Sequence, residues 1–406
     1  MPVSRKTYIR RRFGVFGGLG IFLLAAFYLP VTLLAPLPAA TATTVATTVP
    51  DNPAVELAWP GFGSSAIGAV GFPGVLASSG PTTPRTIASI TKIVTSLVVL
   101  QKMPLSEGTD GPTITMTSAD VELYYSFIAR DGEVRPVWAG LSLTQRQLLE
   151  VVLIASANNY AQSMATWAFG SEDAFLTAAA AWLSEHGLNH TTLHDSTGMD
   201  PRNTSTTADL IALGKLAIAD PTVSSIVAMK SVNLPYFGTV NNTNKLLGID
   251  GVRGIKTGTL DEAGACLLFA SDIEVDGHPV TIIGVVLGGP DHPTIDAAIR
   301  ALLASAAKGF RELPLVTAGE VFYTYSTVWD QSARAVASKD ESALVWAGTT
   351  VTRTATTASE LREGHTGDTV GAVTFSVGGT TVSVPLDLDG TVADPGPWWR
   401  LTHPFG

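Results

Sequence analysis

The run from Ile90 to Leu100 constrains the fold most strongly, because its apolar residues recur at the spacing of a buried helix. Ser89 stands at the start of this predicted helix, and Lys92 follows three residues later. Side chains three residues apart share one helix face, so this hydroxyl and amine can come within hydrogen-bonding distance. Backbone N–H groups at a helix start also favour a developing oxyanion. The sequence therefore predicts a helix whose first turn carries a reactive serine.

A serine hydroxyl is a poor nucleophile at neutral pH, so a base must take its proton as it attacks a carbonyl carbon. Lys92 can be this base while its amine is neutral, and both burial and a second nearby cation favour the neutral amine. Lys256 can supply the second positive charge. This chemistry needs no histidine, and the sequence contains neither a His-Glu-x-x-His nor a Gly-x-Ser-x-Gly motif.

Context separates the copies of two short motifs. Ser-x-x-Lys recurs at Ser305-Ala306-Ala307-Lys308, late in a helical stretch over residues 293–310, where we expect a solvated helix face. Ser-x-Asn occurs as Ser156-Ala157-Asn158 and again at Ser231, where the chain has an extended pattern interrupted by a proline. Ser156 instead stands between two predicted helices, and such a junction can project side chains into a cleft.

The segment Lys256-Thr257-Gly258 lies in a short strand-like piece that is bounded by glycines. Gly258 allows a substrate backbone to approach closely. An edge strand here can pair with a peptide by β-addition, while Lys256 and Thr257 hold the terminal carboxylate of that peptide. The alternative interpretation is a surface lysine in a turn.

Together these motifs resemble the penicillin-recognising serine hydrolases. The resemblance covers residues 54–310 and is closest to the D-alanyl-D-alanine carboxypeptidase family, the low-molecular-weight penicillin-binding proteins. It implies an α/β (α+β) fold of the serine β-lactamase and penicillin-binding-protein transpeptidase type, with an antiparallel sheet and a helical subdomain. Five stretches carry it beyond the first motif: Leu153–Asn158, His194–Asp200, Asn203–Thr206, Asn242–Leu247 and Gly254–Gly264.

The resemblance also implies a role for each catalytic side chain. Ser89 would be acylated by peptidoglycan stem peptides that end in D-Ala-D-Ala, and Lys92 would take its proton. Ser156 would relay a proton to the leaving D-alanine, and Asn158 would orient the scissile amide. Water would then release the shortened peptide, and β-lactam antibiotics would acylate the same serine. The mechanism implies no cofactor and no metal ion.

Substrate binding is implied for four residues of the third motif. Lys256 and Thr257 would bind the terminal carboxylate, and Gly258 would lie against the peptide. Thr259 would contribute its backbone N–H, together with that of the reactive serine, to an oxyanion hole. The chain departs from the family pattern at Leu260, at Asn159 where aspartate is common, and in a long stretch over residues 116–143.

Several alternatives remain open. A D,D-endopeptidase or transpeptidase would form the same acyl-enzyme and differ in the substrate or acceptor. A class A β-lactamase shares two of the motifs, but no convincing loop glutamate is present. Outside the enzymes, the chain could be an inert cell-wall-binding scaffold or a β-lactam sensor, which intact motifs and a short N-terminal basic segment disfavour.

The N-terminal segment predicts a membrane anchor. Five basic residues precede position 13, and an apolar run over residues 13–35 follows that is long enough to cross a bilayer. The positive charges predict that residues 1–12 stay in the cytoplasm and that the catalytic domain lies outside. The alternative is a secreted protein, released by signal-peptide cleavage near Ala40-Thr41-Ala42.

The net charge and the cysteine count exclude nucleic-acid binding and an internal disulfide. The net charge of −10 becomes more negative once the basic N-terminal segment is set aside, so the chain would repel nucleic acid. Cys266 is the single cysteine, which excludes an internal disulfide, and we expect it to be a buried strand residue.

Periodicity divides the rest of the chain into three parts. Residues 36–53 are rich in Ala, Thr and Pro and predict a linker. Residues 54–314 predict the catalytic domain, with strands at both ends, helices between them and a cleft where they meet. Residues 315–406 contain short strand-like runs separated by turn residues, which predict a C-terminal β-sandwich.

Overall fold

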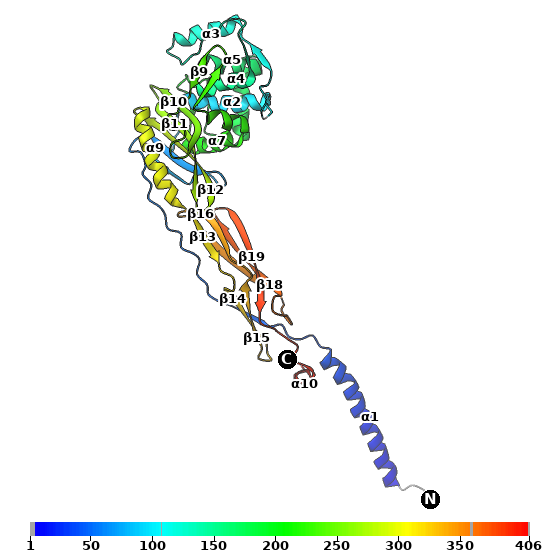
Figure 1. The fold of residues 1–406 in the computed structure, drawn as a ribbon. Coiled ribbons are helices and arrows are strands. Elements are labelled where there is room, and N and C mark those ends of the chain that lie inside the picture. The colour runs from blue at the N-terminus through cyan, green and yellow to red at the C-terminus, as the bar shows by residue number, and fades with distance from the viewer. Residues whose placement is uncertain (1–4, 107, 358–359, 405–406) are drawn as a thin grey trace. The chain divides into compact units, whose positions relative to one another are not determined.

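The computed structural model describes residues 5–106, 108–357 and 360–404, and the chain divides into two compact units (Figure 1). The first unit comprises residues 53–311 together with 346–348. The second unit combines the N-terminal segment, as far as residue 52, with residues 312–345 and 349–406.

The first unit contains a five-stranded antiparallel sheet. The prediction that the Lys256-Thr257-Gly258 segment lies on an edge strand is confirmed, because β10 is the first strand of this sheet. At the other edge of the sheet, residues 64–69 pair antiparallel with residues 77–79. In sheet order the strands are β10 (Val252–Leu260), β11 (Gly264–Val275), β12 (His278–Gly289), β2 (Ser64–Ala69) and β3 (Ala77–Ser79).

Helices cover both faces of this sheet, which explains why β11 and β12 are buried along most of their length. Helix α9 (His292–Ala306) contacts these two strands, and α7 (Thr207–Ala219) lies on the opposite side of the sheet (Figure 1). Gly214 lets α7 approach closely, because an added Cβ would lie 2.4 Å from Ile283 Cγ2. Cys266 is buried in β11, as predicted.

A helical subdomain surrounds α2 (Thr91–Lys102), whose residues 91–100 are all buried. The predicted buried helix is therefore confirmed. Helix α2 contacts four neighbouring helices, which form one hydrophobic core around it. The subdomain also contains α3 (Ser118–Ile128), α4 (Gln145–Ile154), α5 (Asn158–Phe169), α6 (Glu172–Glu185) and α8 (Pro221–Val227).

Local sequence signals explain where these helices begin and end. Thr144 and Gln147 form a capping box at the start of α4, because each side chain bonds the backbone of the other residue. Ser171 caps α6 by accepting the N–H of Ala174 through its side chain. Gly170 ends α5 in the left-handed conformation that favours glycine.

The second unit is β-rich, as predicted for residues 315–406. A six-stranded sheet and the β13–β16 pair share one hydrophobic core, which is the arrangement of a sandwich. Two of its strands, β13 and β15, were not predicted from the sequence pattern. The strands are β13 (Phe310–Val316), β14 (Val321–Ser326), β15 (Ser332–Ala337), β16 (Glu341–Trp346), β17 (Val351–Thr357), β18 (Thr369–Val377) and β19 (Thr380–Asp389).

The segment expected to be a linker, residues 36–53, contains an additional strand. Residues Thr41–Thr44 form β1, which pairs antiparallel with β14 at the edge of the six-stranded sheet. All four residues are exposed, so no hydrophobic alternation marked this strand in the sequence. Its stability comes instead from backbone hydrogen bonds to an edge strand that would otherwise leave its N–H and C=O groups unpaired.

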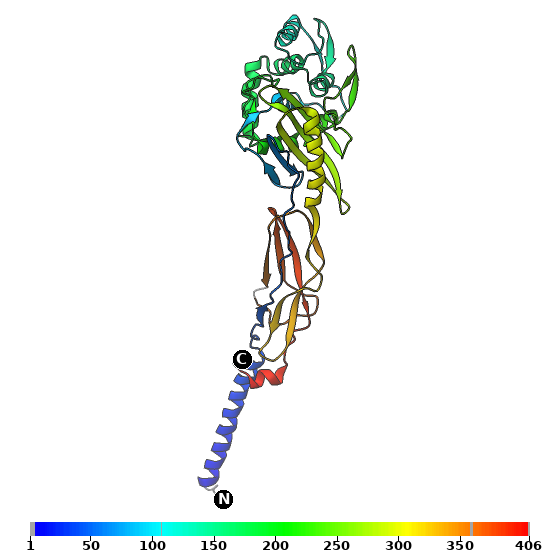
Figure 2. The same ribbon diagram turned by 90° about the vertical axis from the view of Figure 1, so that its left-hand side faces the viewer.

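Helix α1 (Arg5–Leu33) is long and apolar enough to cross a membrane, a property that it shares with signal sequences. It begins before the predicted anchor over residues 13–35, so the basic residues from Arg5 onwards are part of the same helix. A short C-terminal helix, α10 (Pro397–Thr402), packs against its end within the second unit (Figure 2). Tyr28 donates a hydrogen bond to the carbonyl of Leu401 at 2.7 Å.

Candidate active site

Ser89 lies in a single 3-10 turn, Ala88–Ile90, immediately before α2. The residue before it, Ala88, has a φ of 45°, a left-handed conformation that costs free energy for a residue with a Cβ atom. Gly198 fits closely against this turn, because an added Cβ would lie 2.0 Å from the Ala88 carbonyl oxygen. Ser89 is thus presented on a constrained piece of backbone at the edge of a cavity.

Lys92 is fully buried and has three hydrogen-bond partners. Its Nζ atom lies 2.9 Å from Ser89 Oγ, 2.6 Å from Asn158 Oδ1 and 2.6 Å from the Thr197 carbonyl oxygen. The two carbonyl-type oxygens can only accept hydrogen bonds. A neutral amine would therefore direct its two N–H groups to them and leave its lone pair for the proton of the serine hydroxyl.

The electrostatics of the site favour this neutral amine. Burial is the largest effect and lowers the pKa of Lys92 well below its ordinary value, and the charge of Lys256 lowers it further. Asp195 and Glu133 act in the opposite direction. Burial also lowers the pKa of Lys256, to about 7, against the effect of Glu133. A charged Lys256 therefore favours the neutral form of Lys92.

The second motif lies at the junction between α4 and α5, as predicted. Ser156 is buried, has a φ of 59° and lines the cavity, while Asn158 begins α5. The backbone N–H of Asn158 donates to the carbonyl of Glu133 at 2.7 Å. This bond joins α5 to residues 130–133, which form part of the cavity wall.

The third motif borders the cavity from the edge strand β10. Gly258 allows β10 to lie against the serine turn, because an added Cβ would come within 3.2 Å of the Ser89 backbone nitrogen. Thr257 Oγ1 lies 2.5 Å from Thr243 Oγ1, and Thr259 Oγ1 lies 2.8 Å from His292 Nε2. Lys256 is buried beneath the strand and donates to the Thr257 carbonyl oxygen.

The cavity has a volume of about 810 Å³, and six of the eight predicted residues line it. Lys92 lies behind the wall and bonds two of them, Ser89 and Asn158. Lys256 does not line the cavity either, and it acts on Lys92 through its charge. The chemical role of each side chain stays a prediction. The predicted residues on the cavity wall are Ser89, Ser156, Asn158, Thr257, Gly258 and Thr259, with Lys92 behind them.

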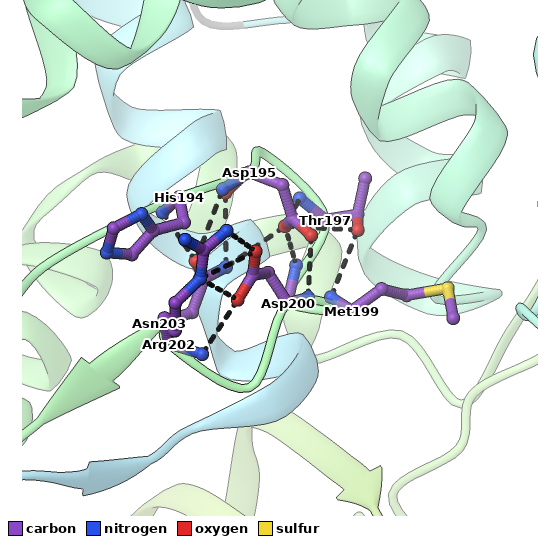
Figure 3. A network of polar contacts seen from close by, with 8 residues as sticks. His194, Asp195, Thr197, Met199, Asp200, Arg202 and Asn203 are labelled. Carbon is purple, nitrogen blue, oxygen red and sulfur yellow. Dashed lines mark hydrogen bonds and ion pairs between the residues drawn. The ribbon is translucent and has the colours of Figure 1, made fainter.

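Sequence reasoning missed the turn that supplies the third partner of Lys92. In Figure 3, the carboxylate of Asp195 lies at the centre of this turn and accepts the backbone N–H groups of Thr197, Gly198 and Asp200 at 2.6–2.8 Å. Asn203 Nδ2 donates to the same carboxylate at 3.0 Å. The Asp-Ser-Thr-Gly sequence is typical of such a side-chain-stabilised turn and could have indicated it.

The Asp195→Asn substitution is expected to loosen this turn. One acceptor oxygen becomes an NH₂ group facing backbone donors, which should lower the free energy of unfolding by about 1–3 kcal/mol. Displacement of the Thr197 carbonyl from Lys92 should slow acylation by penicillin about 10- to 100-fold. Thermal unfolding and stopped-flow acylation measure both effects. Asp200→Asn is the control, because Asp200 pairs with the exposed Arg202, and equal behaviour of the two variants would contradict the prediction.

The pH dependence of acylation follows from the two lysines. The rate should rise with pH as Lys92 loses its proton, and it should fall above a pH of about 7 as Lys256 becomes neutral. A Lys256→Arg variant keeps its charge at high pH. The fall in its acylation rate should therefore begin at a higher pH than in the wild type, whatever its maximum rate. Second-order rate constants for penicillin between pH 5 and 10 measure the profile. An unchanged alkaline limb in this variant would contradict the assignment.

The antiparallel sheet, the helical subdomain and the serine–lysine site between them are those of a serine peptidase with the penicillin-binding-protein fold. A family model for D-alanyl-D-alanine carboxypeptidases matches residues 73–291, and the chain belongs to this family. The predicted family, fold class and enzyme class are therefore confirmed.

Individual relatives agree with this assignment. The chain is 28% identical over 271 residues to a D-alanyl-D-alanine endopeptidase of Escherichia coli (strain K12), which covers 64% of this chain and 82% of the relative. It is 26% identical over 273 residues to the D-alanyl-D-alanine carboxypeptidase DacA of the same strain, covering 66% of each. The crystal structure of the D-alanyl-D-alanine carboxypeptidase DacD from Francisella tularensis has the same fold, with a TM-score of 0.59, 19% identity and coverage of 86% and 97%.

Proposed function

We propose that Ser89 forms an acyl-enzyme with peptidoglycan stem peptides and that the chain thereby removes their terminal D-alanine. The observation that carries this proposal is the set of three contacts made by Lys92 Nζ. Two of them are to oxygens that can only accept, so the neutral lysine has its lone pair available to the serine hydroxyl. A lysine held in this way serves as a general base without a histidine.

The proposed reaction proceeds in two halves. Lys92 takes the proton of Ser89 as its Oγ bonds to the carbonyl carbon, and the backbone N–H groups of Ser89 and Thr259 stabilise the oxyanion. Ser156 relays a proton to the amine of D-alanine as the amide bond breaks, and Asn158 orients that amide. Water then attacks the ester, loses a proton to the base, and releases the shortened peptide with restoration of the serine hydroxyl.

Substrate recognition is proposed for the third motif. A peptide extended along the edge strand β10 can add its own backbone hydrogen bonds to the sheet. Thr257 and the charge of Lys256 would receive the terminal carboxylate, which is why the pKa of Lys256 matters for binding as well as for acylation. Because Gly258 has no side chain, the peptide backbone could approach the strand closely. β-Lactam antibiotics would acylate the same serine.

We also propose that α1 anchors the protein in the cell membrane with the catalytic unit on the outer side. The basic residues in the first turns of α1 favour a cytoplasmic N-terminus, and the apolar remainder of the helix suits the hydrocarbon core. Cleavage after secretion is the alternative, and the mass of the mature N-terminus in the native host distinguishes the two.

The proposed function is tested with the full-length protein in detergent micelles. Intact mass after incubation with penicillin should increase by the mass of one drug molecule, and a stem pentapeptide should release one equivalent of D-alanine. A cross-linked dimer assayed in parallel tests D,D-endopeptidase activity, which the name of the Escherichia coli relative makes the second candidate. A folded protein that forms no adduct, consumes no drug and releases no D-alanine would overturn the proposal.

A further inference from the structure

Two exposed aromatic rings lie edge to face beside the candidate active site. Trp138 and Tyr236 have ring centroids 5.5 Å apart at an interplanar angle of 89°, and they are 45% and 70% exposed. They come from different elements, the segment after α3 and the turn between β8 (Ser231–Leu234) and β9 (Gly238–Asn241). Single exposed apolar residues are ordinary, but a pair assembled from distant segments is a surface feature that calls for a function.

The two rings border a groove, which we call the aromatic groove. It has a volume of about 360 Å³ and combines apolar ring surface with hydrogen-bonding side chains. The groove is lined by Arg135, Pro136, Tyr236, Phe237, Thr239, Val240 and Asn241, and Trp138 packs on its Tyr236 edge.

Helix α5 holds both walls of the aromatic groove in place. The Asn159 amide accepts the N–H of Arg135 at 3.1 Å and donates to its carbonyl at 3.0 Å. The next residue of α5, Tyr160, donates to the Pro136 carbonyl at 2.7 Å, and its ring packs edge to face on Phe237 of the opposite wall. Both walls therefore rest on one buried tyrosine, which gives the groove the rigidity that a binding site needs.

The turn that joins β8 to β9 sets the backbone at Tyr236, because the N–H of Phe237 bonds the Leu234 carbonyl at 3.2 Å and Pro235 occupies the second turn position. Its φ is 70°, a left-handed conformation that is uncommon for a bulky residue and that glycine would adopt at no steric cost. The turn thereby presents the Tyr236 ring mostly to solvent, where it is open to a ligand.

The groove borders the candidate active site, because Asn241 lines both cavities. Its chemistry matches a pyranose ring: the C–H face of a sugar is attracted to the negative face of an aromatic ring, and the sugar's polar rim can bond Arg135, Thr239 and Asn241. The Arg135 guanidinium is paired with Glu133 at 2.6 Å, so the groove does not present an unbalanced charge that would select an anion.

We propose that the aromatic groove is a glycan subsite, which binds an amino-sugar ring of the strand to which the substrate peptide is attached. This inference rests on the proposed function, since it concerns the same polymer. Sugar binding here would hold the peptide near Ser89 and raise the efficiency of catalysis for substrates that carry the glycan.

The test compares two substrates in the full-length protein: a stem pentapeptide alone and the same peptide on its disaccharide. The wild type should have a kcat/KM about 5- to 10-fold higher for the disaccharide form, a gain corresponding to one good aromatic contact. Trp138→Ala and Tyr236→Ala should each remove most of this gain while leaving the bare peptide and penicillin acylation unchanged. Tyr125→Ala, at another exposed aromatic residue of the same unit, is the matched control and should keep the gain.

The outcomes separate this inference from the proposed function. Equal kcat/KM for the two substrates in the wild type would overturn the glycan subsite. An equal loss for both substrates in the variants would also overturn it and would assign the groove to the peptide. If neither substrate is cleaved and penicillin does not acylate Ser89, the proposed function fails instead. Binding of peptide-free N-acetylglucosamine oligomers is then measured by the quenching of tryptophan fluorescence, which needs no catalysis. Quenching in the wild type that is lost in Trp138→Ala would support the subsite, and its absence in the wild type would overturn it.

Discussion

The Ser89→Ala substitution is expected to abolish the covalent penicillin adduct and to lower the rate of D-alanine release by at least about 10³-fold. The variant lacks the hydroxyl that lies beside Lys92, whereas the rest of the site stays assembled. The substituted residue loses one contact, to Lys92 Nζ at 2.9 Å, and is half-buried in its turn, so folding should be retained. Intact-mass spectrometry after incubation with penicillin measures the adduct directly.

The second Ser-x-x-Lys motif provides the control for this experiment. Ser305 lies in α9, where its Oγ donates to the Leu302 carbonyl and accepts the N–H of Ala58. Ser305→Ala removes a serine from the same motif and should leave adduct formation unchanged. Persistence of the adduct in Ser89→Ala, or its loss in Ser305→Ala, would show that the nucleophile is another residue.

The Lys92→Met substitution is expected to slow acylation by about 10²- to 10⁴-fold, the range of a lost general base. Methionine has a similar length and no charge, so it removes the cost of burying an amine. The bonds to Asn158 and Thr197 are lost at the same time, and these effects oppose each other in the free energy of unfolding. We therefore expect a large loss of rate with a Tm close to that of the wild type.

Stopped-flow acylation and calorimetry together test this prediction. Lys308→Met is the matched control, because Lys308 belongs to the second motif and is exposed. A Lys92→Met variant that is acylated at the wild-type rate would remove Lys92 from the mechanism. A variant that loses rate only because it has unfolded would be recognised by its melting curve.

Local patterns in the sequence were sufficient for much of the fold. The apolar spacing after Ser89 predicted α2, and the glycine-bounded segment around Lys256 predicted β10. These predictions succeeded because the burial of a helix or strand is recorded in the spacing of its apolar residues along the sequence. The strands β13 and β15 left no such signal, since Pro314 interrupts the first and the second is built of small and charged residues.

The same limit applies to the site. Ser89 and Lys92 are three residues apart, so one turn of chain explains their contact. The Thr197 carbonyl is 105 residues from Lys92, and Asn158 is 66 residues away. Every residue has a backbone carbonyl, so no sequence pattern could indicate which of them bonds to Lys92.

The sequence by itself determined that Ser89 and Lys92 share the first turn of a buried helix and that an apolar helix lies near the N-terminus, because these follow from residue type and short-range spacing. Tertiary structure alone decided that Asp195 shapes the turn around Thr197, that Thr41–Thr44 complete a sheet, and that Trp138 meets Tyr236. The physical reason is that hydrogen bonds, pKa shifts and ring contacts depend on distances between segments. Folding sets these distances through the packing of the whole core.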